Sequence, residues 1–213
     1  MATYSIDDPR KIAREAPYTF FIPDEHRLSV LEVGDSVKLM FRPDPPDREY
    51  ETERMWVNID QINGDEIVGT LDNDPFDMPQ LKSGDQISFK RYNIISIKWA
   101  DNEKDRKYPV SNKEYYDRCI VDACVIEGDV PVYYIYREEP DLNEEADKYP
   151  DSGWRIRGDY RGLSDEEIDS REAKYVALGV VLNQDDSWLH LIAEPIGAAY
   201  VRNFETNEFA PDE

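Results

Sequence analysis

Apolar residues alternate with polar ones in several short segments, a pattern typical of β-strands with one buried face. The clearest examples are residues 36–41, 54–59, 66–71, 86–89 and 132–137. Turn-forming Gly, Pro, Asn and Asp lie between these segments, and helical patterns are short. The pattern predicts an α+β fold, with a strand-rich antiparallel N-terminal unit and a C-terminal antiparallel sheet covered by short helices.

Local signals refine this picture. Asn63-Gly64 separates two alternating segments and favours a type I′ hairpin, because both residues tolerate positive φ. The sequence LEVGD at 31–35 recurs as LKSGD at 81–85, which predicts the same turn ahead of two strands. Further strands are expected at 18–22 and 93–99, and 119–126 is expected to form a hairpin with 132–137. Ser164 and Glu167 have the spacing of a capping box, which predicts a helix that continues with interruptions toward Leu182, and Asp186 is expected to cap a short helix.

A charged stretch without apolar periodicity follows residue 100 and separates two patterned regions. It suggests five parts, which are a polar lead-in (1–16), a β-rich domain (17–100), a linker (101–115), a second α+β domain (116–204) and a disordered acidic tail (205–213). A chain of 213 residues is long enough for either one large domain or two small ones.

The charge balance constrains the partners. Asp and Glu number 47 against 25 Lys and Arg, a formal net charge of −22. Such a surface disfavours nucleic acid and anionic membranes and favours a basic protein partner, although an acidic surface also serves simply to keep a protein soluble and monomeric. The oligomeric state does not follow from the sequence.

The start of the chain has no apolar segment behind a basic region, and no apolar run is long enough to cross a bilayer. Cys119 and Cys124 are expected on one strand, pointing to opposite faces, so they can neither pair there nor form a metal knuckle. Two buried reduced thiols fit a cytoplasmic protein.

Catalytic motifs are missing from the sequence. His26 and His190 are the only histidines, and neither lies in a metal-binding or nucleophile pattern. There is no phosphate-binding glycine loop and no G-x-S-x-G sequence. Asp72-Asn73-Asp74 could bind a cation adventitiously but does not match a calcium loop. A binding protein without a cofactor is therefore expected rather than an enzyme.

The most informative segment runs from Val132 to Trp154, where an aromatic strand leads into an acidic loop that closes on Asp-Ser-Gly-Trp. So much like charge requires either full solvation or a cationic partner. If the segment binds a partner, we expect the contact residues to be Tyr134, Tyr136, Glu138, Glu139, Glu144, Glu145, Asp151 and Trp154. The alternative for Trp154 is a place in the core.

The sequences CVIEG at 124–128, VYYIYREEP at 132–140, DSGWR at 151–155 and EPIGAAY at 194–200 resemble a bacterial immunity-protein family of polymorphic toxin systems, formerly a domain of unknown function. The resemblance covers residues 116–204. The N-terminal part, with ERMWV at 53–57, GTLDNDP at 69–75 and LKSGD at 81–85, looks like a second small bacterial domain family without known activity.

The resemblance implies a protein that neutralises a basic toxin, such as a nuclease, by covering its active site. It transfers no catalytic residue to this chain. The alternative is an enzyme or accessory scaffold whose site is built from scattered residues. A pocket with convergent carboxylates would favour the enzyme, whereas a flat acidic face with exposed aromatic groups would favour binding.

Overall fold

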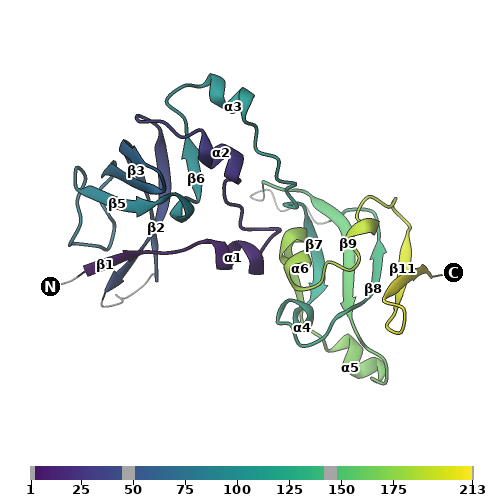
Figure 1. The fold of residues 1–213 in the computed structure, drawn as a ribbon. Helices are drawn as coiled ribbons and strands as arrows, with labels where there is room; N and C mark the ends of the chain where they lie inside the picture. Colours follow the sequence, from purple (N-terminus) through teal and green to yellow (C-terminus); the bar gives the residue numbers. More distant parts are fainter. Residues whose placement is uncertain (1–2, 45–50, 142–147, 213) are drawn as a thin grey trace. The chain divides into compact units, whose positions relative to one another are not determined.

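The computed structural model describes residues 3–44, 51–141 and 148–212. The chain forms two compact units, Met1–Asn112 and Lys113–Glu213. Each unit is built on its own sheet, with a few short helices (Figure 1). The predicted α+β class is confirmed.

The sheet of the N-terminal unit has the order β1-β2-β3-β4-β5, and β6 pairs with β2. Its strands are β1 (Thr3–Ile6), β2 (Ser36–Asp44), β3 (Glu53–Asn63), β4 (Glu66–Leu71), β5 (Gln86–Lys90) and β6 (Ser96–Lys98). The helices are α1 (Arg10–Glu15), α2 (Glu25–Ser29) and α3 (Glu103–Lys107), with a 3-10 turn η1 (Arg91–Asn93). Alternating apolar residues of β2 to β5, including Val37, Leu39, Val57 and Ile87, form the buried core.

The repeated L-x-x-G-D sequence forms the same turn twice, as predicted. In the first copy the Asp35 carboxylate accepts a hydrogen bond from the Glu32 amide, and in the second Asp85 accepts one from the Lys82 amide. The glycine before each Asp has φ near +90°, a backbone conformation that favours glycine. The Gly34 amide then donates to Ile59 of β3, and the Gly84 amide donates to Leu71 of β4. The two turns therefore start β2 and β5 on either side of the β3–β4 hairpin.

The hairpin itself is confirmed, but its turn differs from the prediction. Asn63 pairs with Glu66, so Gly64 and Asp65 form the turn. Gly64 has φ of +61°, whereas neither Asn63 nor Asp65 is among the described residues with positive φ. Positive φ at the first central position alone is the type II′ arrangement, so the predicted type I′ turn over Asn63-Gly64 is wrong.

Three predictions for the N-terminal unit are corrected by backbone pairing and burial. The lead-in is not loose, because Thr3–Ile6 forms β1, which pairs with the end of β2. Residues 18–22 form turns and irregular chain instead of a strand. The predicted linker contains α3, whose Lys104 is buried and whose ammonium group contacts Glu32, Asp35 and the Val30 carbonyl. Sequence periodicity misses this helix because its one buried side chain is a lysine.

The C-terminal unit has a mixed sheet of order β10-β7-β9-β8-β11-β12, in which β7 and β9 run parallel (Figure 1). Its strands are β7 (Arg118–Asp122), β8 (Val132–Arg137), β9 (Asp151–Gly158), β10 (Ala173–Ala177), β11 (Ala199–Asn203) and β12 (Glu208–Pro211). The helices are α4 (Ala123–Ile126), α5 (Asp165–Asp169) and α6 (Leu178–Gln184), with a 3-10 turn η2 (Leu189–Leu191). In Figure 1, α4 and α6 lie over β7, and α5 lies beyond the end of β9.

This arrangement corrects the predicted hairpin between 119–126 and 132–137. The expected long strand ends at Asp122 and continues as α4, so Cys119 and Cys124 lie on different elements. β9 then inserts between β7 and β8. A second correction concerns the tail, because Glu208–Pro211 forms β12, paired with β11.

The predicted capping box at Ser164 and Glu167 is present and starts α5. The helix ends at Asp169, however, because the chain turns into β10 before α6 begins at Leu178. The predicted N-cap at Asp186 is wrong, because the N-cap residue of η2 is Trp188. No helix in the described ranges is long and apolar enough to span a membrane.

Candidate functional site

The Asp-Ser-Gly-Trp sequence forms an irregularity at the start of β9. Arg118 of β7 pairs with Asp151, whereas Ile120, two residues on, pairs with Arg155, so two extra residues of β9 bulge out. In a regular strand Asp151 and Arg155 would be about 13 Å apart. The bulge shortens this separation and brings the two side chains into contact on one face.

Gly153 is required at the centre of this bulge. Its φ is +80°, and a Cβ atom there would lie 2.2 Å from the Glu138 carbonyl oxygen. The Glu138 amide donates to the Gly153 carbonyl at 3.0 Å. The Gly153 amide donates to Asp151, and the Ser152 hydroxyl donates to the Arg118 carbonyl. The bulge is therefore fixed both to β7 and to the end of β8.

Arg155 is the centre of a buried ion-pair cluster. Its two terminal nitrogens each lie 2.9 Å from an oxygen of Asp151, and its Nε donates to Glu138. A third carboxylate, Asp141, lies 3.2 Å from the guanidinium. The Arg155 side chain is 4% exposed and that of Asp151 is fully buried. Hydrogen bonding to Asp151 is the largest cause of the raised Arg155 pKa, so the guanidinium stays charged.

The neighbouring residue, Trp154, points to the opposite face. It is fully buried, its ring lies 5.7 Å from that of Trp188, and its indole nitrogen donates to the Ile192 carbonyl at 3.2 Å. The Arg137 guanidinium lies 5.7 Å from the Trp154 ring centre. The expectation of Trp154 as a contact residue is therefore wrong, and the alternative of a core residue holds. The prediction of Asp151 as a contact residue is also wrong, because its side chain is fully buried against Arg155.

The face that carries Arg155 and Arg157 differs from the helix-covered face in its chemistry. Tyr134 and Tyr136 of β8 pair with Arg157 and Arg155 of β9, and their rings lie 5.6 Å apart. Both tyrosines are half-buried. Burial, followed by a hydrogen bond to Asp212, raises the pKa of Tyr134. We call the surface formed by Tyr134, Tyr136, Arg155, Arg157 and the adjacent Glu138 the open face.

A hollow of about 240 Å³ lies on the open face. At its end nearest α5, Asp122 is 2.9 Å from Arg157 and 3.0 Å from Arg171. Arg157 also donates to the Ile168 carbonyl of α5. Three guanidinium groups, each with a carboxylate partner, therefore border the hollow, together with the apolar residues Ile120, Ile168 and Ala173.

The predicted contact residues fall into three groups. Tyr134, Tyr136 and Glu138 come together on the open face, and Glu139 is exposed just beyond it. Asp151 and Trp154 are buried. Glu144 and Glu145 lie outside the described residues.

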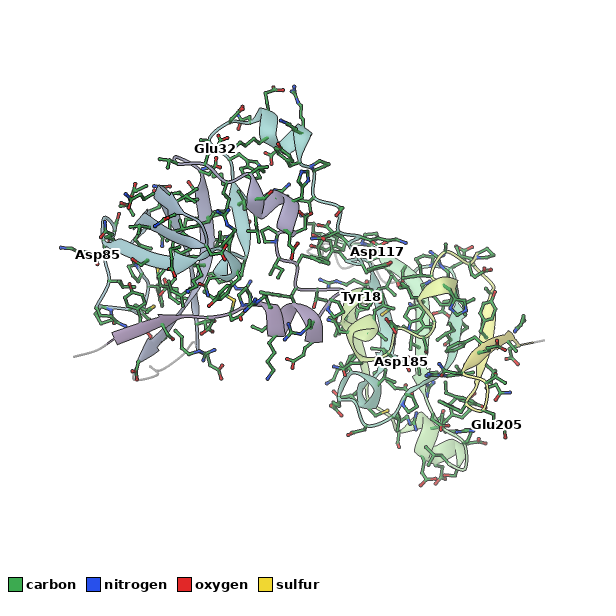
Figure 2. The ribbon with its side chains drawn as sticks, in the orientation of Figure 1. Tyr18, Glu32, Asp85, Asp117, Asp185 and Glu205 are labelled. Atoms are coloured by element: carbon green, nitrogen blue, oxygen red, sulfur yellow. The ribbon has the colours of Figure 1, made fainter. Side chains whose placement is uncertain are left out.

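Several residues of this region were not predicted. They are Arg155 and Arg157 of the open face and, beside them, Asp122 and Arg171. The alternation W-R-I-R at 154–157 could have predicted the two strand arginines, because they must face away from Trp154 and Ile156. Asp185 was also missed. Its carboxylate accepts hydrogen bonds from the Val132 amide at 2.9 Å and from Arg202 at 2.6 Å, which ties the end of α6 to the sheet. Figure 2 labels Asp185 in the C-terminal unit.

Burial and ion pairs constrain the reactive side chains of the C-terminal unit. Burial raises the pKa of both cysteine thiols, so neither is an activated nucleophile. Across the described ranges, no group of three His, Cys, Asp or Glu side chains is placed to hold a metal ion. Glu138 and Asp122 are each held by an arginine. Aromatic rings and arginines, both present on the open face, are enriched in protein interfaces.

Two family models match the chain. Residues 119–213 match the model described as Immunity protein Imm33 domain, and residues 13–108 match the model described as Uncharacterized protein conserved in bacteria (DUF2314). Both resemblances expected from the sequence are confirmed. Neither a curated protein nor a solved structure matches. The first match supports an immunity-protein role for the C-terminal part.

Proposed function

We propose that the C-terminal unit, which matches the Immunity protein Imm33 domain, neutralises a bacterial toxin by binding it directly through the open face. The observation that carries the proposal is the adjacent pair Tyr134 and Tyr136, half-buried beside the arginine and carboxylate groups of β9. Tyrosine and arginine are enriched among residues that dominate interface affinity.

The open face is held in place before binding. Arg155 is fixed by Asp151 and Glu138, and Tyr134 is fixed by Asp212. A surface whose side chains are already ordered loses less conformational entropy on association. Preorganisation of this kind favours tight binding to one partner.

We further propose that the toxin is basic, for example a nuclease. The net charge of −22 creates a field that accelerates encounter with a cationic partner by about 10- to 1,000-fold at low ionic strength. Glu139 and Asp141 are exposed beside the open face and contribute to this field locally. The toxin would act in the cytoplasm, where two reduced cysteines are compatible with the redox state.

The test is affinity capture from a lysate of the source bacterium. The wild type, the double variant Tyr134→Ala/Tyr136→Ala and the control Tyr92→Ala, which removes an exposed ring on the other unit, are immobilised in parallel. Bound proteins are eluted with a salt gradient and identified by mass spectrometry. A basic protein retained by the wild type and the control but lost from the double variant supports the proposal, and co-expression must then suppress its toxicity.

Two results would contradict the proposal. If the toxin is expressed and no basic protein is retained, direct binding is refuted. If the double variant retains the toxin as well as the wild type does, the open face is not the binding surface. Near-UV circular dichroism of the double variant checks that its fold is intact.

A further inference from the structure

The N-terminal unit displays an aromatic side chain that its own core does not cover. Phe76 is 84% exposed, although it lies between Pro75 and the buried Met78. An exposed phenylalanine alone needs no explanation. The surroundings of Phe76 indicate a binding site, because the loop that carries it is fixed by hydrogen bonds and a hollow lies beside it.

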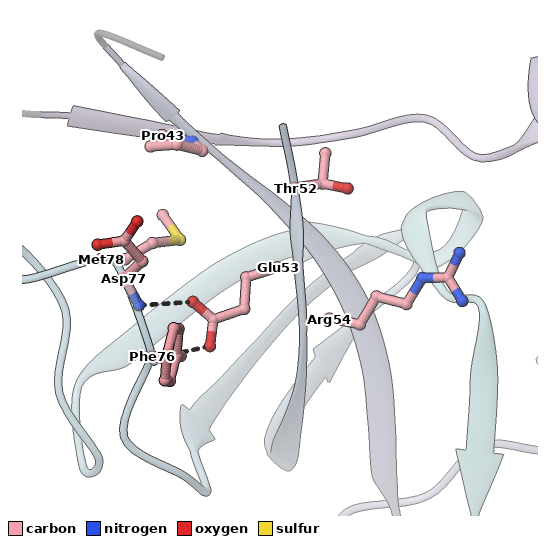
Figure 3. A pocket seen from close by; sticks show the side chains of 7 residues that line it. All are labelled: Pro43, Thr52, Glu53, Arg54, Phe76, Asp77 and Met78. Carbon is pink, nitrogen blue, oxygen red and sulfur yellow. Dashed lines mark hydrogen bonds between the residues drawn. The ribbon is translucent and has the colours of Figure 1, made fainter. Parts of the chain in front are cut away.

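The loop is held by hydrogen bonds from three directions. The Glu53 carboxylate of β3 accepts from the Phe76 amide at 2.6 Å and from the Asp77 amide at 3.3 Å, as Figure 3 shows. The Trp56 amide donates to Asn73, and the Ser83 amide donates to Asp74. These hydrogen bonds fix the backbone that carries Phe76, so less conformational entropy is lost when a partner binds.

The hollow beside this loop has a volume of about 390 Å³. Most of the surface that lines it is apolar, and the described residues at the hollow are Pro43, Thr52, Glu53, Arg54, Phe76, Asp77 and Met78. In Figure 3, Met78 and Pro43 face each other across the space, whereas the guanidinium of Arg54 extends away from Phe76. A volume of this size accommodates one medium or large apolar side chain of a partner.

Among the described residues that line the hollow, the acidic Glu53 and Asp77 outnumber the basic Arg54, and this charge favours a cationic partner. Asp72, Asp74 and Asp77 lie in the loop, and two of the three are exposed. A cationic segment would pair with these carboxylates, whereas a second copy of this chain, also at −22, would be repelled.

We propose that this hollow is a docking site for a basic protein segment, in which one apolar side chain packs against Phe76, Pro43 and Met78 while flanking Lys or Arg residues pair with Asp74 and Asp77. The site lies on the unit that does not match the immunity model, and it is independent of the toxin-binding function proposed above.

The test uses synthetic peptides and the full chain labelled with ¹³C at the methionine methyl groups. The probe peptide carries one leucine between two pairs of lysines. One control peptide has serine in place of leucine, and a second has glutamate in place of lysine. Met78 lines the hollow and Met55 is buried in the core, so their methyl signals report on the site and on the rest of the unit.

The leucine peptide is expected to shift the Met78 signal and leave that of Met55 unchanged. Phe76→Ala should weaken this binding about tenfold, as for an interface anchor. Asp77→Asn should weaken it less, with a smaller effect at high salt. Tyr92→Ala, the matched control, should bind as the wild type does.

Several outcomes would overturn the inference. Equal affinity for the serine peptide would mean that only the net charge is recognised. Binding of the glutamate peptide, or unchanged affinity in Phe76→Ala, would exclude the proposed contacts. Self-association of the wild type that Phe76→Ala abolishes would make a second copy of the chain the occupant instead.

Discussion

Asp35 and Asp85 close the same turn in two copies of one sequence motif, but only Asp35 is buried. Each carboxylate accepts a hydrogen bond from the amide three residues before it, at 2.9 Å. Asp35 also accepts from the Ala100 amide and lies 3.3 Å from the Lys104 ammonium group. The first turn thus connects α3 to the sheet in addition to starting a strand.

Asp35→Asn is therefore expected to destabilise the N-terminal unit by about 3 kcal/mol, because it leaves the buried Lys104 without its closest buried counter-ion. Asp85→Asn should cost about 1 kcal/mol, the contribution of a turn hydrogen bond. Urea unfolding followed by tryptophan fluorescence measures both. Equal losses would show that the contact with Lys104 adds nothing.

Arg155→Ala should destabilise the C-terminal unit by about 3 to 5 kcal/mol, because the Asp151 carboxylate remains buried without a counter-ion. The double variant Arg155→Met/Asp151→Leu should recover most of this loss, since it removes both charges. Arg106→Ala, at an exposed pair with Glu103, serves as the control and should change the free energy of unfolding by less than about 1 kcal/mol. A double variant as unstable as the single one would argue against the buried-charge explanation.

Gly153→Ala should cost more than about 3 kcal/mol, because its Cβ would collide with the Glu138 carbonyl and its φ is positive. Gly197→Ala has a similar φ of +92° but no atom within 4 Å of the added carbon, and should cost about 1 kcal/mol. Thermal unfolding compares the two. The difference between the variants isolates the steric clash from the backbone preference.

Both thiols should react slowly with iodoacetamide at pH 8, and Cys119 should react more slowly than the partly exposed Cys124. Burial raises the pKa of Cys119, with the charge of Asp151 as the second cause. An unfolded thiol ionises at about pH 8.5, so the unfolded chain loses this proton first and stability should fall as the pH rises above that value. Mass spectrometry of the labelled chain follows the rates, and Cys119→Ala should lack this part of the pH dependence.

Once the toxin is identified, Glu139→Gln should lower its association rate and flatten the salt dependence while leaving stability unchanged. Glu139 is chosen because it is exposed, whereas Glu138 is bound to Arg155 and its replacement would disturb the cluster. Glu166→Gln, an exposed acid on α5, is the control. Stopped-flow measurements at several salt concentrations would refute steering if the slopes were identical.

The sequence predicts those features that depend on neighbouring residues. The L-x-x-G-D turns, the β3–β4 hairpin and the capping box of α5 are local, and each was found. The position of β9 between β7 and β8 could not be predicted, because strand order depends on contacts between distant segments. The same reason explains why 119–126 was expected to pair with 132–137.

The candidate site was predicted in part. The rings of Tyr134 and Tyr136 lie 5.6 Å apart on one face, as alternation along a strand requires, whereas their role as contact residues stays a prediction. The sequence did not show which face of the sheet carries Trp154. A β-bulge changes which residues point to each face, and the alternation of apolar and polar residues does not reveal where a bulge occurs. Helix α3 was missed because its buried side chain is a lysine that packs over Trp99.

The contact between Trp154 and Trp188 has a practical consequence for spectroscopy. The electronic transitions of two indole rings 5.7 Å apart and inclined at 61° are coupled. The C-terminal unit therefore has a circular dichroism signal of its own. Trp56 and Trp99 belong to the other unit. Loss of the coupled signal therefore reports the melting of one unit of the intact chain, without cutting the protein or attaching a dye.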